Sequence, residues 1–492
     1  RALGYPVSVS AHDPRSMAPI LLGCVVAIAL LHAASLPVAT NDLHIFLAMG
    51  RWMSGNGEIL RSEVFTWTAQ GTPFENPTWG FSCLSWALYQ GIGLEGLRLF
   101  NGATIGLALL AVYGACRSLK IEPRASALAT LYAWLLLLQN LSVRGQTWVF
   151  LLLPMAIWLG AQRRHPAVHL IGGLLLGALW SNLHGSFPVA LLWLGVWGAS
   201  ALWTAREFKA AVPTWSTALG LGIGTLCNPE VSGVWSFLYA NSSSPIARGF
   251  VEWYPPQVFS FAGARLYGAL ALWAGLSLRR RPQLGSVILV LAFGVLAAQG
   301  IRFIAWFGLA TAPLLALWLS RAPPSQDGWP KRGLQILGGT LALFFLGLAL
   351  RLLPPERGLK TQTPIAAAEA LRESCGNCTG ARILNPPEYG GYLNVAVPGL
   401  LTSGDIRSWV FPDSAWQVYL EMSEAPPDWE QRLTEHQVDY VLLWRPSQGE
   451  TLLPAMQAST TWELLAEDEM SALMRRRPEG GLLPLSKPPI GE

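Results

Sequence analysis

Apolar runs of about 15 to 20 residues recur along most of this 492-residue chain, and short basic or polar stretches separate them. The sequence is 52% hydrophobic and only 13% charged, whereas an ordinary soluble domain is about 25% charged. A soluble protein with one large core would need amphipathic helices, but these runs are apolar on every side. The pattern therefore predicts a polytopic α-helical membrane protein whose partners include membrane lipids and no nucleic acid.

Hydropathy and the positions of Lys and Arg predict about eleven spans and their orientation. The predicted spans cover residues 18–37, 99–116, 125–141, 147–161, 167–180, 187–203, 215–227, 266–278, 284–299, 303–320 and 334–353. Residues 79–94 are apolar but interrupted by glycines, and we interpret them as an interfacial or re-entrant helix, because counting them as a span would misplace the basic residues 117–124. With the N-terminus in the cytoplasm, the basic clusters lie inside and everything after residue 353 lies outside.

Two long loops and the C-terminal part are expected outside the cytoplasm. Residues 41–79 and 228–261 belong to a predicted transmembrane domain, 1–353, and both are too long to be simple connectors. In residues 354–492 polar residues return and the apolar runs shorten, which predicts a small extracytoplasmic α/β domain. Within it we expect a helix at 365–372, buried strands at 382–384 and 440–443, and a terminal strand pair at 462–465 and 472–474.

The six cysteines divide into two groups. Four lie in or beside apolar runs and are expected to be packing residues. Cys375 and Cys378 lie in the C-terminal part, which the predicted topology places in an oxidising compartment. A disulfide that closes a short loop is favoured over redox catalysis, because no thioredoxin-like frame surrounds the pair. A metal site would need two further ligands, and the nearby sequence offers none.

The unusual polar residues gather in the loops predicted to face outside, most of them at helix ends. They are Asp42, His44, Arg144, His184, Arg248, Glu252 and Arg302. Ionisable groups at such depths are functional candidates by default. Arginines suit a phosphate, because guanidinium groups form charge-assisted hydrogen bonds with it. We expect the three arginines, His184 and Glu252 to bind the substrate, and Asp42 with His44 to be catalytic, Asp42 as general base or as ligand of a divalent metal.

Each of these residues also has a purely structural explanation. Asp42 can cap the helix that follows it, since Asp is favoured at that position. His44 can be a hydrogen-bonded residue at the membrane interface, and His184 can belong to a structural turn. Single arginines near the interface commonly extend to lipid headgroups. The residues alone leave both sets of roles open.

Motifs along nearly the whole chain resemble those of a large group of uncharacterised bacterial membrane proteins. They are Asn41-Asp42, Gly50-Arg51-Trp52, Trp180-Ser181-Asn182-Leu183-His184-Gly185, Asn228-Pro229, Glu252-Trp253, Glu388-Tyr389-Gly390-Gly391-Tyr392-Leu393 and Asp439-Tyr440-Val441-Leu442. That group resembles the GT-C superfamily of glycosyltransferases, which use polyprenyl-phosphate sugar donors. The resemblance implies a protein of the bacterial cytoplasmic membrane, with Asp42 as base, the outer arginines as donor-phosphate ligands and the C-terminal domain as a lid or acceptor platform.

The chain departs from the group's pattern at two positions in the first loop. Phe46 stands where the group commonly has a histidine, and Thr78 stands where it commonly has a glutamate directly before the loop-closing Trp79. Two functions therefore remain open. One is a glycosyltransferase that moves a sugar from a polyprenyl-phosphate donor to an extracytoplasmic acceptor, and the other is a non-catalytic GT-C-like subunit of a larger membrane complex. A transporter is less favoured, because the sequence shows no internal repeat or paired broken helices.

Overall fold

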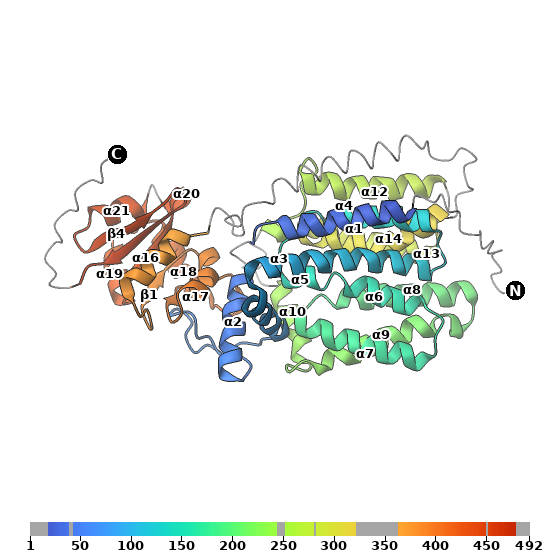
Figure 1. Ribbon diagram of the computed structural model, residues 1–492, viewed down its shortest axis with the longest axis horizontal. Coiled ribbons are helices and arrows are strands. Elements are labelled where there is room, and N and C mark those ends of the chain that lie inside the picture. Colours follow the sequence, from blue (N-terminus) through green and yellow to red (C-terminus); the bar gives the residue numbers. More distant parts are fainter. Residues whose placement is uncertain are drawn as a thin grey trace. The chain divides into compact units, whose positions relative to one another are not determined.

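The chain folds into two compact units, which Figure 1 shows as ribbons. The computed structural model describes residues 18–38, 43–243, 251–279, 282–320, 363–448 and 451–478. The helical unit contains the described residues up to 38, from 49 to 60 and from 75 to 320, and the second unit contains residues 43–48, 61–74 and those from 363 onward. Two segments of the predicted first loop thus fold with the C-terminal part of the chain.

The helical unit consists of α-helices joined by turns and short 3-10 segments. Its α-helices are α1 (Ala18–Ser35), α3 (Trp79–Ser118), α4 (Pro123–Leu137), α5 (Gly145–Trp148), α6 (Leu152–Ala161), α7 (Pro166–Leu183), α8 (Pro188–Ala205), α9 (Val212–Gly224), α10 (Gly233–Ser243), α12 (Phe261–Arg279), α13 (Leu284–Gln299) and α14 (Ile304–Ser320). Its 3-10 helices are η1 (Phe208–Ala210), η2 (Thr225–Cys227), η3 (Val251–Trp253) and η4 (Ile301–Phe303). Helix α2 (Leu43–Asn56) begins among residues of the second unit and ends among those of the helical unit.

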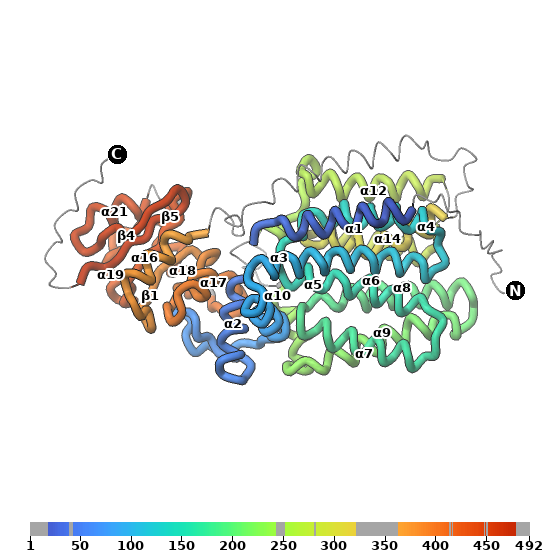
Figure 2. Tube along the Cα trace, viewed as in Figure 1, coloured from blue at the N-terminus to red at the C-terminus, as the bar shows by residue number. Residues whose placement is uncertain are grey.

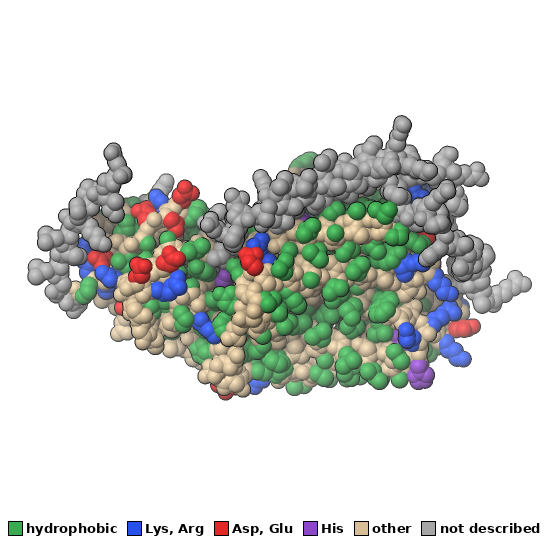
Figure 3. All heavy atoms as spheres, viewed as in Figure 1, with side chains coloured by type: hydrophobic (Ala, Val, Ile, Leu, Met, Phe, Trp, Pro, Cys, Tyr) green, Lys and Arg blue, Asp and Glu red, His purple; other side chains and the backbone are tan. Residues whose placement is uncertain are grey.

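Apolar helices give this unit the character of a multi-pass membrane protein. In the described part of the chain, six helices are long and apolar enough to cross a membrane: α1, α3, α7, α8, α12 and α14 together with η4. Residues Gly145–Ala161 and Leu284–Gln299 are shorter apolar stretches. In Figure 3 apolar side chains cover the visible face of this unit, and most of its visible Lys and Arg side chains gather at one end. The predicted span 334–353 lies outside the described residues, and the total of about eleven remains a prediction.

Most predicted spans overlap one helix, but three stretches differ from the prediction. Residues 79–94 and 99–116 belong to one element, α3, which is interrupted at Gly93 (φ 67°, ψ −171°). Glycine adopts positive φ without steric cost, so the glycine-rich break in the sequence becomes a kink within a helix. The predicted span 147–161 is divided between α5 and α6, and the predicted span 215–227 ends in the 3-10 helix η2.

Helices α7 and α9 approach each other through glycines on both sides of their contact. A Cβ on Gly173 or Gly177 would collide with the backbone of α9, and a Cβ on Gly220 or Gly224 would collide with the backbone of α7. The four-residue spacing places each pair on one face of its helix. Small residues let membrane helices approach closely enough for van der Waals contact between backbones, which drives association where the hydrophobic effect is weak. This packing also fixes the end of α7, directly before His184.

The second unit is built on a five-stranded sheet, and its chain path can be followed in Figure 2. The strand order is β2-β1-β3-β5-β4; β1 pairs in parallel with β2 and β3, and the other pairs are antiparallel. The strands are β1 (Arg382–Leu384), β2 (Leu401–Thr402), β3 (Tyr440–Trp444), β4 (Trp462–Glu467) and β5 (Ser471–Arg476). The helices are α16 (Ile365–Cys375), α17 (Pro387–Ala396), α18 (Asp413–Ser423), α19 (Trp429–Glu435), α20 (Arg445–Gln448) and α21 (Leu452–Ala458). The four predicted strands and the predicted helix are confirmed, whereas β2 is too short to leave a pattern in the sequence.

Residues 61–74 extend this sheet beyond β2. The backbone N–H of Trp67 donates to the Thr402 carbonyl (3.0 Å), and the N–H of Thr402 donates to the Phe65 carbonyl (2.9 Å). The Trp67 indole also donates to the Ile383 carbonyl of β1 (3.0 Å). A stretch that the sequence presents as part of an external loop is therefore one edge of the C-terminal fold.

A buried ion network holds the same segment in place. The Arg407 guanidinium donates two hydrogen bonds to Asp405 (2.8 and 2.6 Å) and lies 2.7 Å from Glu63 Oε2. None of the three side chains is more than 1% exposed. Three rings surround the guanidinium carbon at 5.5 to 5.9 Å: Phe65, Phe74 and Phe411. Burial would lower the pKa of Arg407, but Asp405 and Glu63 outweigh it and hold that pKa above its ordinary value, so the guanidinium remains charged.

Replacing Gly220 by Ala tests the contact between α7 and α9. The added Cβ would collide with the Leu170 carbonyl, whereas Gly222 on the same helix has open space around it. We expect Gly220→Ala to lower the free energy of unfolding by about 1–3 kcal/mol through overpacking. Gly222→Ala is the matched control, because it makes the same chemical change in the same helix. Thermal unfolding of the detergent-solubilised protein measures both, and equal melting temperatures would contradict the packing assignment.

Replacing Arg407 by Met tests the ion network. Two carboxylates would then be buried without their cation, which costs about 3–5 kcal/mol in comparable sites. We expect a lower melting temperature and faster proteolysis within residues 61–74. The control is Arg432→Met, because Arg432 also binds two carboxylates, Glu421 and Asp428, but on the surface. We expect little change in the melting temperature of the control. Equal melting temperatures for the two variants would contradict a stabilising role for the buried network.

Candidate functional site

The structure brings four of the seven predicted site residues together in the helical unit. Arg144, His184, Glu252 and Arg302 form one cluster, as the contacts below establish. His44 lies in the second unit, where its buried ring meets Tyr392 edge-on at 5.3 Å. Asp42 and Arg248 lie outside the described residues, so their predicted roles stay predictions.

Glu252 bridges the two arginines of the cluster. Its Oε2 lies 2.5 Å from Arg144 Nη1, and its Oε1 lies 2.9 Å from Arg302 Nη1. All three side chains are partly buried, with 33%, 22% and 17% of their surface exposed in the order Glu252, Arg144, Arg302. Each carboxylate oxygen thus neutralises a different guanidinium group, and the trio carries a net charge of +1.

Local structure explains how each arginine reaches the cluster. Arg144 precedes α5 in an extended conformation, and its backbone N–H donates to Thr147 Oγ1 (3.2 Å). Arg302 lies in η4, the short turn between α13 and α14, where its guanidinium carbon is 4.5 Å from the centre of the Trp253 ring. The Gln146 side-chain amide donates to the Arg302 carbonyl (3.1 Å), which ties the two arginine-bearing turns together.

The charges of the cluster determine how its acidic and basic groups titrate. Burial alone would raise the pKa of Glu252, but the Arg302 and Arg144 charges outweigh it and hold that pKa below its ordinary value. Glu252 is therefore a carboxylate at neutral pH. Burial, and then the positive charge of Arg302, lower the pKa of His184 from 6.5 to about 3, with Arg144 acting in the same direction and Glu252 opposing. His184 is therefore neutral at any physiological pH.

Exposed apolar side chains flank Glu252 along the chain. Val251 is 70% exposed, Tyr254 is 49% exposed and Phe259 is fully exposed. They are joined by Val258 and Phe261 in the segment that leads from η3 into α12. Arginines beside an exposed apolar surface suit a ligand that carries both an anionic group and a hydrocarbon chain.

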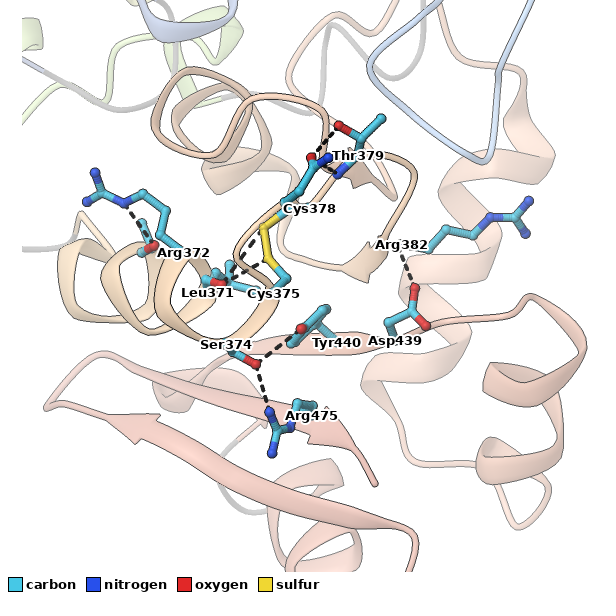
Figure 4. Close-up of a disulfide and its surroundings, with 12 residues drawn as sticks. Leu371, Arg372, Ser374, Cys375, Cys378, Thr379, Arg382, Asp439, Tyr440 and Arg475 are labelled. Carbon is cyan, nitrogen blue, oxygen red and sulfur yellow. Dashed lines mark hydrogen bonds between the residues drawn. A yellow bond between two sulfur atoms is a disulfide. The ribbon is translucent and has the colours of Figure 1, made fainter. Parts of the chain in front are cut away.

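Cys375 and Cys378 form a disulfide in the second unit, at the C-terminal end of α16 (Figure 4). Beside it, Ser374 Oγ lies 3.2 Å from the Tyr440 hydroxyl and accepts a hydrogen bond from Arg475 (2.9 Å). The negative end of a helix disfavours a thiolate, whereas redox-active cysteines sit where the thiolate is stabilised. The location therefore fits a structural cross-link. Within the described residues, no group of three or more His, Cys, Asp and Glu could hold a metal ion.

Three residues that hold the cluster were not predicted as site residues. Gln146 and Trp253 contact Arg302, and Ser186 contacts His184. Trp253 directly follows Glu252, and its place in a quoted motif was the only sequence signal. Gln146 bonds the Arg302 carbonyl through its side-chain amide, and Ser186 bonds His184 through its hydroxyl and its backbone N–H; neither contact leaves a recognisable spacing in the sequence.

The neutral state of His184 predicts a pH dependence of stability. Below pH 6.5 the unfolded chain takes up a proton at this side chain and the folded protein does not, so stability falls as the pH falls from 7 towards 3. We expect the wild type to lose about 2 kcal/mol more than His184→Gln between pH 7 and pH 5. Thermal unfolding across this range measures it, with the exposed His165→Gln as control. Parallel curves for wild type and His184→Gln would contradict the assignment.

Comparison with known proteins gives matches of fold but not of sequence. No protein-family model matches the chain, and neither does any curated protein. ArnT from Cupriavidus metallidurans bound to undecaprenyl phosphate is similar in structure, with a TM-score of 0.56 and 13% identity over 93% of this chain and 97% of ArnT. The Archaeoglobus fulgidus oligosaccharyltransferase has a TM-score of 0.54 and 14% identity over 86% of this chain and 69% of its own.

A third neighbour is the arabinofuranosyltransferase AftD from Mycobacteria. Its TM-score is 0.55, with 15% identity over 94% of this chain and 41% of AftD. All three neighbours are GT-C glycosyltransferases. At such low identity the likeness is one of architecture, and it confirms the predicted resemblance at that level. The chain is a multi-pass membrane protein with a GT-C-like fold.

Proposed function

We propose that this chain is a membrane glycosyltransferase that takes its sugar from a polyprenyl-phosphate donor and transfers it to an extracytoplasmic acceptor. The observation that carries the proposal is the cluster of Arg144, Glu252 and Arg302, together with the exposed apolar side chains that flank Glu252 along the chain. A polyprenyl phosphate has the matching pair of features, an anionic head and a long hydrocarbon chain. The likeness to ArnT, whose structure contains undecaprenyl phosphate, supports the same ligand class.

In this proposal the two arginines stabilise the group that leaves. An acceptor hydroxyl oxygen bonds to the anomeric carbon of the sugar, and the bond from that carbon to the phosphate oxygen breaks. The bonding electron pair leaves with the phosphate, whose charge the guanidinium groups stabilise through charge-assisted hydrogen bonds. The hydroxyl proton passes to a base, and Asp42 is our proposed base, alone or with a divalent metal. Its assignment rests on the resemblance of the first loop.

The topology forms part of the proposal. We place the protein in the bacterial cytoplasmic membrane with about eleven spans and a cytoplasmic N-terminus. Residues 354–492, with the segments of the first loop that fold with them, then lie outside and serve as a lid or acceptor platform. The cluster of arginines occupies turns between helices, as expected for a site at the membrane surface.

One observation favours a second function. Glu252 already occupies a position between the two arginines, as in an ion network whose only role is structural. A GT-C-like subunit without catalytic activity, held in a larger membrane complex, would keep such a network for stability. The two proposals differ in one respect: whether a phosphate competes with Glu252 for the arginines.

Native mass spectrometry of the protein in detergent measures how tightly it binds undecaprenyl phosphate, and this affinity distinguishes the glycosyltransferase from the structural subunit. We expect Arg144→Gln and Arg302→Gln to weaken binding by about 10–100-fold each, since a hydrogen bond to a charged group contributes about 1.5–3 kcal/mol. Glu252→Gln removes the competing carboxylate and should tighten binding. The control is Arg206→Gln, whose side chain lies over Trp203 at the end of α8.

Two outcomes would favour the structural subunit over the glycosyltransferase. One is unchanged lipid binding in both arginine variants. The other is lower thermal stability in Glu252→Gln without any change in lipid affinity, particularly if stoichiometric protein partners copurify in mild detergent.

A further inference from the structure

Hydrogen bonds around His184 determine which of its ring nitrogens carries the proton. Nδ1 accepts the backbone N–H of Ser186 (3.2 Å) and lies 2.9 Å from Ser186 Oγ. The fully buried Trp180 indole donates to the same Oγ (3.0 Å). Because the indole can only donate, Ser186 Oγ accepts there and its own proton is available for His184. The Ser186 backbone N–H can only donate, so Nδ1 accepts and is unprotonated, and the Ser186 hydroxyl can donate to the same nitrogen.

A neutral imidazole with an unprotonated Nδ1 carries its proton on Nε2. In the described part of the chain, no residue forms a hydrogen bond with His184 Nε2. The ring carbon bonded to Nε2, Cδ2, faces Gly145, where a Cβ would lie only 3.5 Å from it. Gly145 directly follows Arg144, so this edge of the ring faces the turn that carries one arginine of the cluster.

We infer that His184 donates a hydrogen bond through Nε2–H to the anionic group that Arg144 and Arg302 bind, and that Ser186 and Trp180 are positioning residues that fix this tautomer. The inference rests on the proposed function for the identity of the anion, the phosphate of a polyprenyl lipid. The orientation of the proton stands on the hydrogen bonds alone.

The charged groups around His184 fit a donor and not a base. Arg302 and Arg144 act on it with positive charge, and Glu252 opposes them. A cation on the ring would add to two existing cations, so the ring stays neutral when an anion is absent. A neutral donor adds a third directed contact to a phosphate without changing the charge of the site.

The tautomer can be read directly by ¹⁵N NMR of protein labelled only at histidine. The chain has seven histidines, and His184→Gln assigns the signal that disappears. We expect the His184 signal to show protonated Nε2 and unprotonated Nδ1, unchanged between pH 5 and pH 8. Ser186→Ala removes the hydroxyl and keeps the backbone N–H, so we expect a smaller fraction of protonated Nε2, whereas the control Ser236→Ala, an exposed serine whose hydroxyl donates to the Gly233 carbonyl, should leave the signature intact. A protonated Nδ1 in the wild type would overturn the inference.

Lipid binding supplies the second readout. We expect His184→Phe to weaken undecaprenyl phosphate binding about 10-fold and Ser186→Ala about 3-fold, since each removes or misdirects one hydrogen bond to a charged group. His184→Gln should bind more tightly than His184→Phe, because its amide N–H can partly take the place of Nε2–H. Wild-type affinity in His184→Phe would overturn the inference while leaving the arginine result, and with it the proposed function, unaffected. Unchanged lipid binding in Arg144→Gln and Arg302→Gln would overturn the proposed function, and only the tautomer assignment would then stand.

Discussion

One carboxylate that holds two guanidinium groups is the interaction on which the candidate site depends. Arg144 and Arg302 each bind one oxygen of Glu252, at 2.5 and 2.9 Å, so their like charges are close enough to repel each other. The carboxylate between them offsets that repulsion. The three residues come from three separate connections between helices, so a local ion network also fixes where those connections meet. The charges of these three side chains sum to +1 in a partly buried place. In the proposed function an anionic phosphate binds there, and Asp42 serves as the base.

Close packing of the helices brings these connections together. The glycine contacts between α7 and α9 fix the end of α7, and Gly80 of α3 approaches the Asn182 backbone at that end. The Trp79 indole donates to the Asn182 side chain (2.5 Å), which adds a directed bond to the same junction. A larger side chain at Gly80, or at one of the glycines between α7 and α9, would displace the turn that carries His184. The packing of the apolar helices therefore also determines the geometry of the polar turn at the end of α7.

The sequence allowed the parts that depend on local pattern to be predicted. Runs of apolar residues located most helices, and short apolar runs between polar residues located four strands of the second unit. Four of the residues predicted to form a site, Arg144, His184, Glu252 and Arg302, lie near one another, as polar residues at helix ends on one face can; their roles remain predictions. What the sequence could not supply was pairing over long distances. Nothing in the vicinity of Glu63 indicates Arg407, and a two-residue strand such as β2 has no period to detect. The contact of Ser186 with His184 is not predictable for a different reason: serine is common in turns, and half of the contact is a backbone N–H that every residue except proline has.

The buried network of Glu63, Asp405 and Arg407 explains how so short a pairing is specified. One parallel bridge, Thr66 with Thr402, sets a register only weakly, because a slip of one residue would cost few hydrogen bonds. Buried ion networks add little net stability compared with apolar packing of equal volume. Their geometry is nevertheless demanding: Asp405 binds the guanidinium through both oxygens while Glu63 must reach the same group from another segment. A slip along β2 would leave one carboxylate buried without its cation, so the charges select the register that the backbone alone would leave open.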